Sequence, residues 1–149
     1  MNMRAIPPRW GLTIVRVMAG VIITVAGTEK LAAGFPAFTQ VVTSLSIPLP
    51  QFWGVFIPFL EAIGGALLIL GLGARWVAIL FTIEYFVTSI VLKVPRQPPF
   101  GGWESMRIDM MLLASAIMVV LAGPGALALE SILFRRRGEA VAAGRPAVT

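Results

Sequence analysis

Four long apolar runs dominate this sequence and constrain its fold more than any other feature. A helix needs roughly 20 mostly apolar residues to cross a bilayer, and the runs at about 10–27, 51–72, 76–92 and 103–122 come close to that length. The chain is 58% hydrophobic and only 13% charged, whereas a soluble domain has about 25% charged residues. The pattern predicts an all-α membrane protein built as a four-helix bundle.

The 149 residues allow one domain. We expect a cytoplasmic N-terminus over 1–9, a single four-helix domain over 10–134 and a basic, disordered cytoplasmic tail over 135–149. Segments rich in Pro and Gly, such as 93–102, separate the helices. Arg16 interrupts the first apolar run, which favours a retained helix over a cleaved signal peptide.

The longest connection joins the first two spans. Its large apolar residues recur at helical spacing, at Phe35, Phe38, Val41, Val42 and Leu45. This spacing predicts a short helix from Pro36 to Ser46 that lies in the membrane interface. An irregular loop is the alternative.

The distribution of Lys and Arg predicts the orientation, since cytoplasmic loops carry the excess of positive charge. Seven basic residues fall on the side of the termini, namely Arg4, Arg9, Arg75, Arg135, Arg136, Arg137 and Arg145. Four fall on the other side, namely Lys30, Lys93, Arg96 and Arg107. We therefore expect both termini in the cytoplasm and a multi-pass protein of a bacterial-type inner membrane.

Each apolar run carries one ionisable residue at membrane depth: Arg16, Glu61, Glu84 and Asp109. A charge at the bilayer centre costs about 2.5 to 3.5 kcal/mol on the insertion scale, which the surrounding apolar residues can offset. Such a residue still needs a partner or water, so it is expected to face the bundle interior or another subunit.

Arg16 and Glu61 lie on helix faces lined with small residues, which let helices approach closely. At about 1.5 Å per residue, Arg16 lies roughly 9 Å and Glu61 roughly 15 Å from the cytoplasmic ends of their helices. We therefore predict a contact between them. Pro58 should bend the second helix and free a carbonyl near Glu61. Arg16, Glu61, Pro58 and Lys30 are candidate ligand-binding residues, and a purely structural lock between two helices is the alternative.

The third helix is polar on two sides. Glu84 and Thr88 share one face, and Tyr85 points in another direction. We expect one side to pack in the bundle and the other to meet a partner subunit or a second copy, so these three residues are candidates for a partner interface.

The start of the fourth helix predicts an ion pair at the membrane interface. Asp109 follows closely on Glu104 and Arg107 and could pair with Arg107 or with Lys30. The chain has no Cys and no His, which excludes thiol chemistry and the commonest ligand for haem and zinc. We expect no metal site, and redox electrons must travel on an organic cofactor or on a partner's metal.

Several landmarks occur in an order that resembles the DoxX family of small four-helix membrane proteins. They are Arg16, the segments 26–31 (AGTEKL), 45–50 (LSIPLP) and 61–72 (EAIGGALLILGL), Arg75, and the segments 102–104 (GWE), 123–125 (GPG) and 129–130 (LE). Many members carry His near the end of the first helix, where this chain has Ala26, and toward the end of the third. The last motif usually ends in Asp, and here it ends in Glu130.

The resemblance implies a link to quinone-dependent oxidoreductases. We therefore expect a membrane subunit of a larger quinone-linked redox or electron-transfer complex, which binds quinone or lipid in a polar site within the bundle. It is not expected to be catalytic alone. The alternative is a non-enzymatic accessory subunit that stabilises a larger membrane complex. A transporter is less favoured, because no inverted repeat is present.

Overall fold

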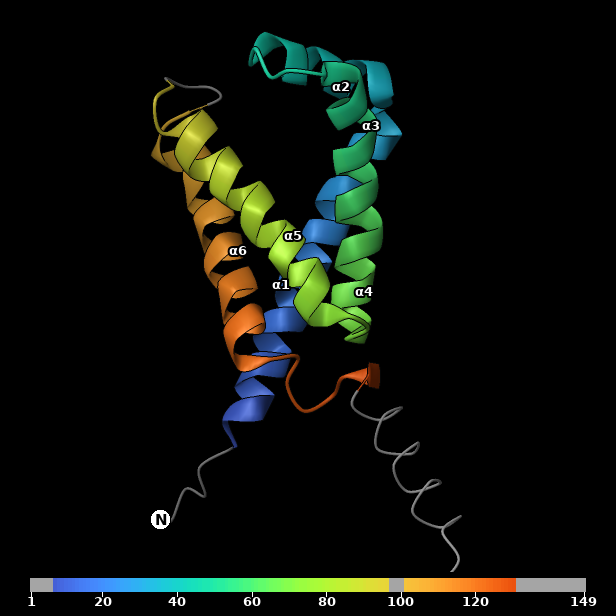
Figure 1. Cartoon of the computed structure of the whole chain (residues 1–149), viewed down its shortest axis with the longest axis vertical. Helices are drawn as coiled ribbons and strands as arrows, with labels where there is room; N and C mark the ends of the chain where they lie inside the picture. The colour runs from blue at the N-terminus through green and yellow to red at the C-terminus, as the bar shows by residue number, and fades with distance from the viewer. Residues whose placement is uncertain (1–6, 97–100, 131–149) are drawn as a thin grey trace, which may run out of the picture.

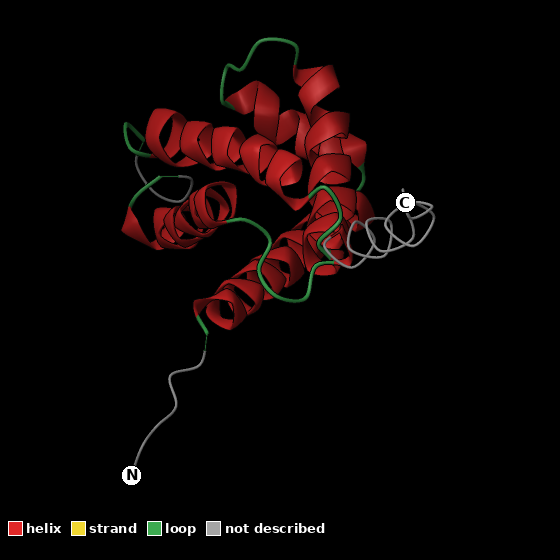
Figure 2. Ribbon diagram, turned by 60° about the horizontal axis from the view of Figure 1, so that its bottom comes forward, coloured by secondary structure: helices red, strands yellow, loops and turns green. Residues whose placement is uncertain are grey.

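The computed structural model describes residues 7–96 and 101–130, and within these ranges it consists of helices and connecting loops (Figure 2). The elements are α1 (Pro8–Ala33), α2 (Phe35–Ser44), α3 (Pro50–Phe59), the π-helical turn η1 (Leu60–Gly64), α4 (Gly65–Leu70), α5 (Ala74–Phe86), the π-helical turn η2 (Val87–Lys93) and α6 (Trp103–Ala122). The tail predicted over 135–149 lies outside the described residues.

Within the described residues, four helices are long and apolar enough to cross a membrane: Pro8–Ala33, Pro50–Leu70, Ala74–Lys93 and Trp103–Ala122. The second comprises α3, η1 and α4, and the third comprises α5 and η2. At most 33% of the most apolar window of any spanning helix is buried. The remaining apolar side chains face outward, as expected of a bundle whose solvent is lipid.

The first helix is longer than its apolar run predicted. It continues past Gly27 through Glu29 and Lys30 to Ala33, because Glu and Lys are good helix formers even though they end the apolar run. It ends where Gly34 adopts a φ of 88°. The short helix expected over 36–46 is present as α2.

Close backbone contact holds the first two spans together. A Cβ atom added to Gly20 would lie 2.9 Å from the carbonyl oxygen of Gly65, and one added to Gly65 would lie 2.9 Å from that of Gly20. The small-residue faces predicted for these helices therefore pack against each other. Thr24 also lies at this contact, where its hydroxyl donates to Gly20 O at 2.7 Å.

The bundle opens toward one end. In Figure 1, α5 and α6 diverge from α1 and α3 toward the end at which α2 lies. At the opposite end, the segment 123–130 folds back on α1, and the amide of Ala126 donates to Arg9 O at 3.2 Å. The first and last described residues thus lie at the same end of the bundle, which agrees with an even number of spans.

Candidate functional site

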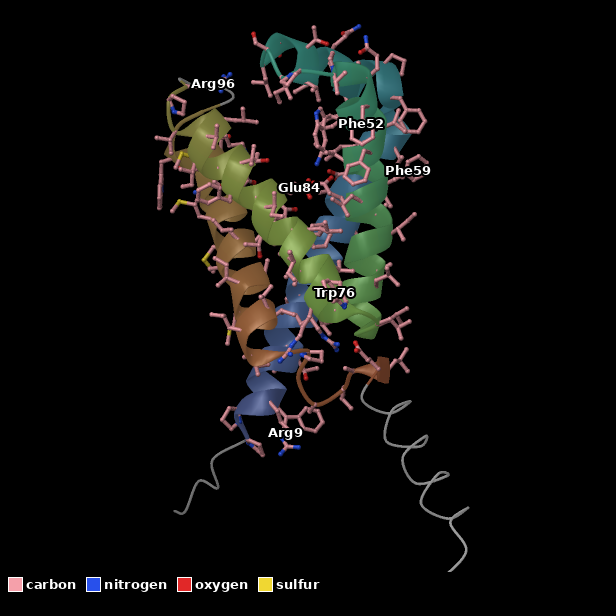
Figure 3. The ribbon with its side chains drawn as sticks, in the orientation of Figure 1. Arg9, Phe52, Phe59, Trp76, Glu84 and Arg96 are labelled. Carbon is pink, nitrogen blue, oxygen red and sulfur yellow. The ribbon has the colours of Figure 1, made fainter. Side chains whose placement is uncertain are left out.

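A cavity of about 190 Å³ lies at the diverging end of the bundle. Its polar lining residues are Lys30, Glu61, Glu84, Tyr85, Thr88, Lys93 and Asp109, and its apolar lining residues are Phe38, Val41, Val42, Leu45, Ile47, Ile57 and Leu92. All the spanning helices and α2 contribute. Figure 3 shows Glu84 on the side of this space formed by α5.

An ion pair between Lys30 and Glu61 forms one wall of the cavity. The Glu61 side chain is 3% exposed and the Lys30 side chain 28% exposed. Lys30 comes three residues after Gly27, where an added Cβ would lie 2.8 Å from Glu61 Cβ. The close approach of α1 to η1 thus brings the ammonium group to the carboxylate. Lys30 Nζ also lies 5.3 Å from the centre of the Phe38 ring, a cation–π distance.

A second ion pair joins η2 to α6. Lys93 Nζ lies 2.6 Å from Asp109 Oδ2 and also donates to the carbonyl of Ser105 at 2.8 Å. Asp109 therefore pairs with Lys93, and the predicted pairing with Arg107 or Lys30 is wrong. Antiparallel packing brings the end of the third span beside the start of the fourth. Arg107 instead pairs with Glu104 at 2.7 Å in an exposed contact outside the cavity.

The partner-interface residues predicted on the third helix face inward. Glu84, Tyr85 and Thr88 all line the cavity, and Tyr85 is 5% exposed. The two polar sides of this helix do not require a partner subunit on its outer face. One cavity borders the helix over more than one side and takes up all three residues. The outer face of α5 carries apolar residues such as Ile79 and Ile83.

The predicted contact between Arg16 and Glu61 is wrong. Arg16 is 1% exposed, and its Nη2 donates to the carbonyl of Leu127 at 2.6 Å. The Gly20–Gly65 contact sets the register of α1 against α4, so Arg16 lies near Gly71 while Glu61 lies near Gly27. The eleven residues from Arg16 to Gly27 span about 16 Å of helix. The predicted depths are measured from helix ends inferred from hydropathy, and these ends differ from the observed ones. In particular, α1 extends to Ala33.

Pro58 is buried within α3 and does not line the cavity. The π-helical turn η1, which contains Glu61, begins two residues after it. A second π-helical turn, η2, begins three residues after Glu84. Such turns are frequent at functional sites. Because each contains more residues than an α-helical turn, it changes the direction in which the later side chains of the helix point. Glu61 and Glu84, the two glutamates of the cavity, thus lie in or just before π-helical backbone.

Lys93 is the lining cation that the sequence analysis missed as a site residue. Lys93 follows directly on the third apolar run, and Asp109 lies near the start of the fourth. Adjacent antiparallel helices joined by a short loop bring such positions together. That signal could have found the pair. No comparable feature of the sequence predicts that residues of α2 line the cavity.

These features define a class: a small four-helix membrane protein with a charged cavity between its helices. The chain belongs to the DoxX family, whose sequence model matches residues 11–94. It is 33% identical over 125 residues to a protein of Bacillus subtilis (strain 168) named "Putative oxidoreductase CatD", over 84% of this chain and 88% of that protein. No solved structure matches the chain.

Proposed function

We propose that the protein is a membrane subunit of a quinone-linked redox complex and that it binds a quinone-type ligand in the cavity. The observation that carries the proposal is the combination of the Lys30–Glu61 pair, whose carboxylate is buried, with an apolar wall formed by α2 and the spanning helices. Ligand sites are typically apolar hollows with a few converging polar groups. The name of the Bacillus relative supports a redox role.

The size of the cavity limits what can enter. Its volume of about 190 Å³ is below the roughly 300 to 1,000 Å³ of typical small-molecule sites. It therefore suits a single ring rather than a whole prenylated quinone. In this proposal the ring packs against apolar residues such as Val42 and Leu92, and the tail lies in lipid.

The polar residues supply binding and protons. Lys30 uses an N–H group that it does not give to Glu61 to donate a hydrogen bond to a ring oxygen. The Glu61 carboxylate accepts a proton and passes it on to the ring. Reduction of a quinone to a quinol also takes two electrons. Because the chain has neither Cys nor His, these electrons come from a partner subunit that carries a redox cofactor.

Purification from the native membrane in mild detergent tests the proposal. Organic extraction followed by mass spectrometry should recover about one quinone per chain, together with a copurifying redox subunit. Glu61→Leu should lower the recovered quinone at least about tenfold, since it removes the carboxylate that holds the Lys30 ammonium donor in place. Glu104→Leu is the matched control, because Glu104 is exposed outside the cavity.

Two other results have clear meanings. A copurifying complex without quinone would support the accessory-subunit alternative and refute the binding role. A protein that migrates alone, without quinone, would refute membership of a complex as well.

A further inference from the structure

Protein acceptors already engage part of the hydrogen-bond donors around the cavity. Lys30 donates to Glu61, and Lys93 donates to Ser105 O while pairing with Asp109. The Thr88 hydroxyl donates to the backbone carbonyl of Glu84 at 2.9 Å. The Tyr85 hydroxyl can either donate or accept. Each ammonium group has three N–H donors, so a ligand that offers only acceptors competes with the protein's own acceptors for them.

The acceptors are in excess. Three carboxylates and two ammonium groups line the cavity. Glu84 Oε2 is buried, and no N–H or hydroxyl donor among the residues that the structure describes reaches it. The Glu84 side chain does lie within hydrogen-bonding distance of the Glu61 side chain, which is itself a carboxyl group. A buried acceptor without a donor costs about 1 to 3 kcal/mol, and more if it is charged. The cavity is therefore complementary to a ligand that donates hydrogen bonds.

The two redox forms of a quinone differ in this property. The oxidised form has two carbonyl acceptors and no donor on these oxygens, whereas the reduced form has two hydroxyl donors. We propose that the cavity binds the quinol in preference to the quinone, with Glu84 as the acceptor of a quinol hydroxyl. This proposal rests on the proposed function and adds which form of the ligand the site selects.

The preference has a consequence for electron transfer. A site that binds the reduced form more tightly makes the bound quinone a stronger oxidant, by about 30 mV for each tenfold preference in a two-electron couple. The bound quinone takes two electrons from the partner's redox cofactor and two protons, and becomes the quinol that Glu84 holds. The site therefore favours electron acceptance by the bound quinone.

Equilibrium binding of a short-chain benzoquinone and its anaerobically reduced quinol to the purified full chain in detergent tests the proposal. We expect the quinol to bind at least about tenfold more tightly, the effect of one hydrogen bond to a charged acceptor. Equal affinities, or tighter binding of the quinone, would overturn the preference and leave the proposed function standing. Binding of neither form would refute the proposed function and the preference with it.

Glu84→Met tests the role of the acceptor. This variant should fold, because it replaces a buried carboxyl with an apolar side chain of similar length. Its quinol affinity should fall to that of the quinone, while quinone affinity stays within about twofold. Glu104→Met, outside the cavity, should keep the preference. A preference that survives in Glu84→Met would show that Glu84 is not the acceptor.

Discussion

The carboxylate of Glu61 is compatible with the bundle interior because the ammonium group of Lys30 lies against it. Removing one partner of a buried pair leaves an uncompensated charge, whereas removing both restores an apolar contact. The partial exposure of Lys30 moderates the cost, since its ammonium group keeps some solvation or interfacial contact. The pair can therefore be tested by a double-mutant cycle.

We predict that Lys30→Met destabilises the protein by about 2 kcal/mol, below the 3–5 kcal/mol expected for a fully buried pair. This corresponds to a fall in Tm of about 4 to 8 °C for a chain of this size. The double variant Lys30→Met/Glu61→Leu should recover most of this loss. Thermal unfolding in detergent provides the measurement. Additive effects of the two substitutions would show that the ion pair contributes no coupling energy.

Arg16 acts at the other end of the bundle, on the segment 123–130. Its guanidinium donates to Leu127 O, while the Thr13 hydroxyl accepts from the amide of Ala126 at 2.9 Å. These contacts fasten the segment to α1. We infer a structural role for Arg16 at this end, instead of the ligand-binding role that the sequence suggested.

Arg16→Met should accelerate amide hydrogen exchange in the segment 123–130 by about tenfold, because it removes a charged donor to that segment. Quinone recovery should be unchanged, since Arg16 lies outside the cavity. Thr13→Val serves as the positive control, because it removes a second contact to the same segment. If Arg16→Met abolishes quinone recovery and leaves exchange unaltered, the structural role is wrong.

At the scale of the helices, contact between glycines sets the register of the bundle. The predicted small-residue faces explain how the first two spans pack closely. This close packing fixes which side chains of the two helices lie at the same height along the bundle axis. Lys30 then meets Glu61, and Arg16 meets the turn after α4. One packing contact thus decides the partners of both buried charges on these helices.

We predict that Gly20→Val destabilises the protein by about 1 to 3 kcal/mol, the usual cost of overpacking. An added Cβ at Gly20 would lie 2.8 Å from Ile69 Cγ1 and 2.9 Å from Gly65 O. Gly11→Ala in the same helix is the control, because no atom of the residues that the structure describes lies within 4 Å of its added Cβ. The same unfolding assay compares them. Equal stabilities for the two variants would argue against the register contact.

At the scale of the whole molecule, membrane orientation rests on the distribution of basic residues. The structure places the first and last described segments at one end and α2 at the other. Because the sequence has no Cys, an introduced cysteine is the only thiol in the chain that a labelling reagent can modify. Single cysteines at exposed positions of the two ends can therefore report the side on which each end lies.

We predict that an impermeant thiol reagent added outside intact cells labels Gln40→Cys, on α2, and not Leu129→Cys. Both should react after the cells are permeabilised. The reverse pattern would place the termini outside and contradict the orientation predicted from the basic residues. The unmodified chain, which has no thiol, gives the background.

Much of the fold could be predicted from short stretches of the sequence taken one at a time. Hydrophobic runs determined the four spans, amphipathic spacing determined α2, and small residues identified the faces that pack. These features depend on composition along a few helical turns, so they can be read without knowing the neighbours. The family followed from the same landmarks in order.

Tertiary structure alone decided which partners the charges of the first two spans meet. The partners of Arg16 and Glu61 depend on the relative heights of helices, and a shift of one helical turn is about 5.4 Å. Helix ends estimated from hydropathy are not accurate enough to fix that height. The cavity, the inward position of Glu84 and the contribution of α2 likewise arise from divergence between spans, for which the linear pattern carries no signal.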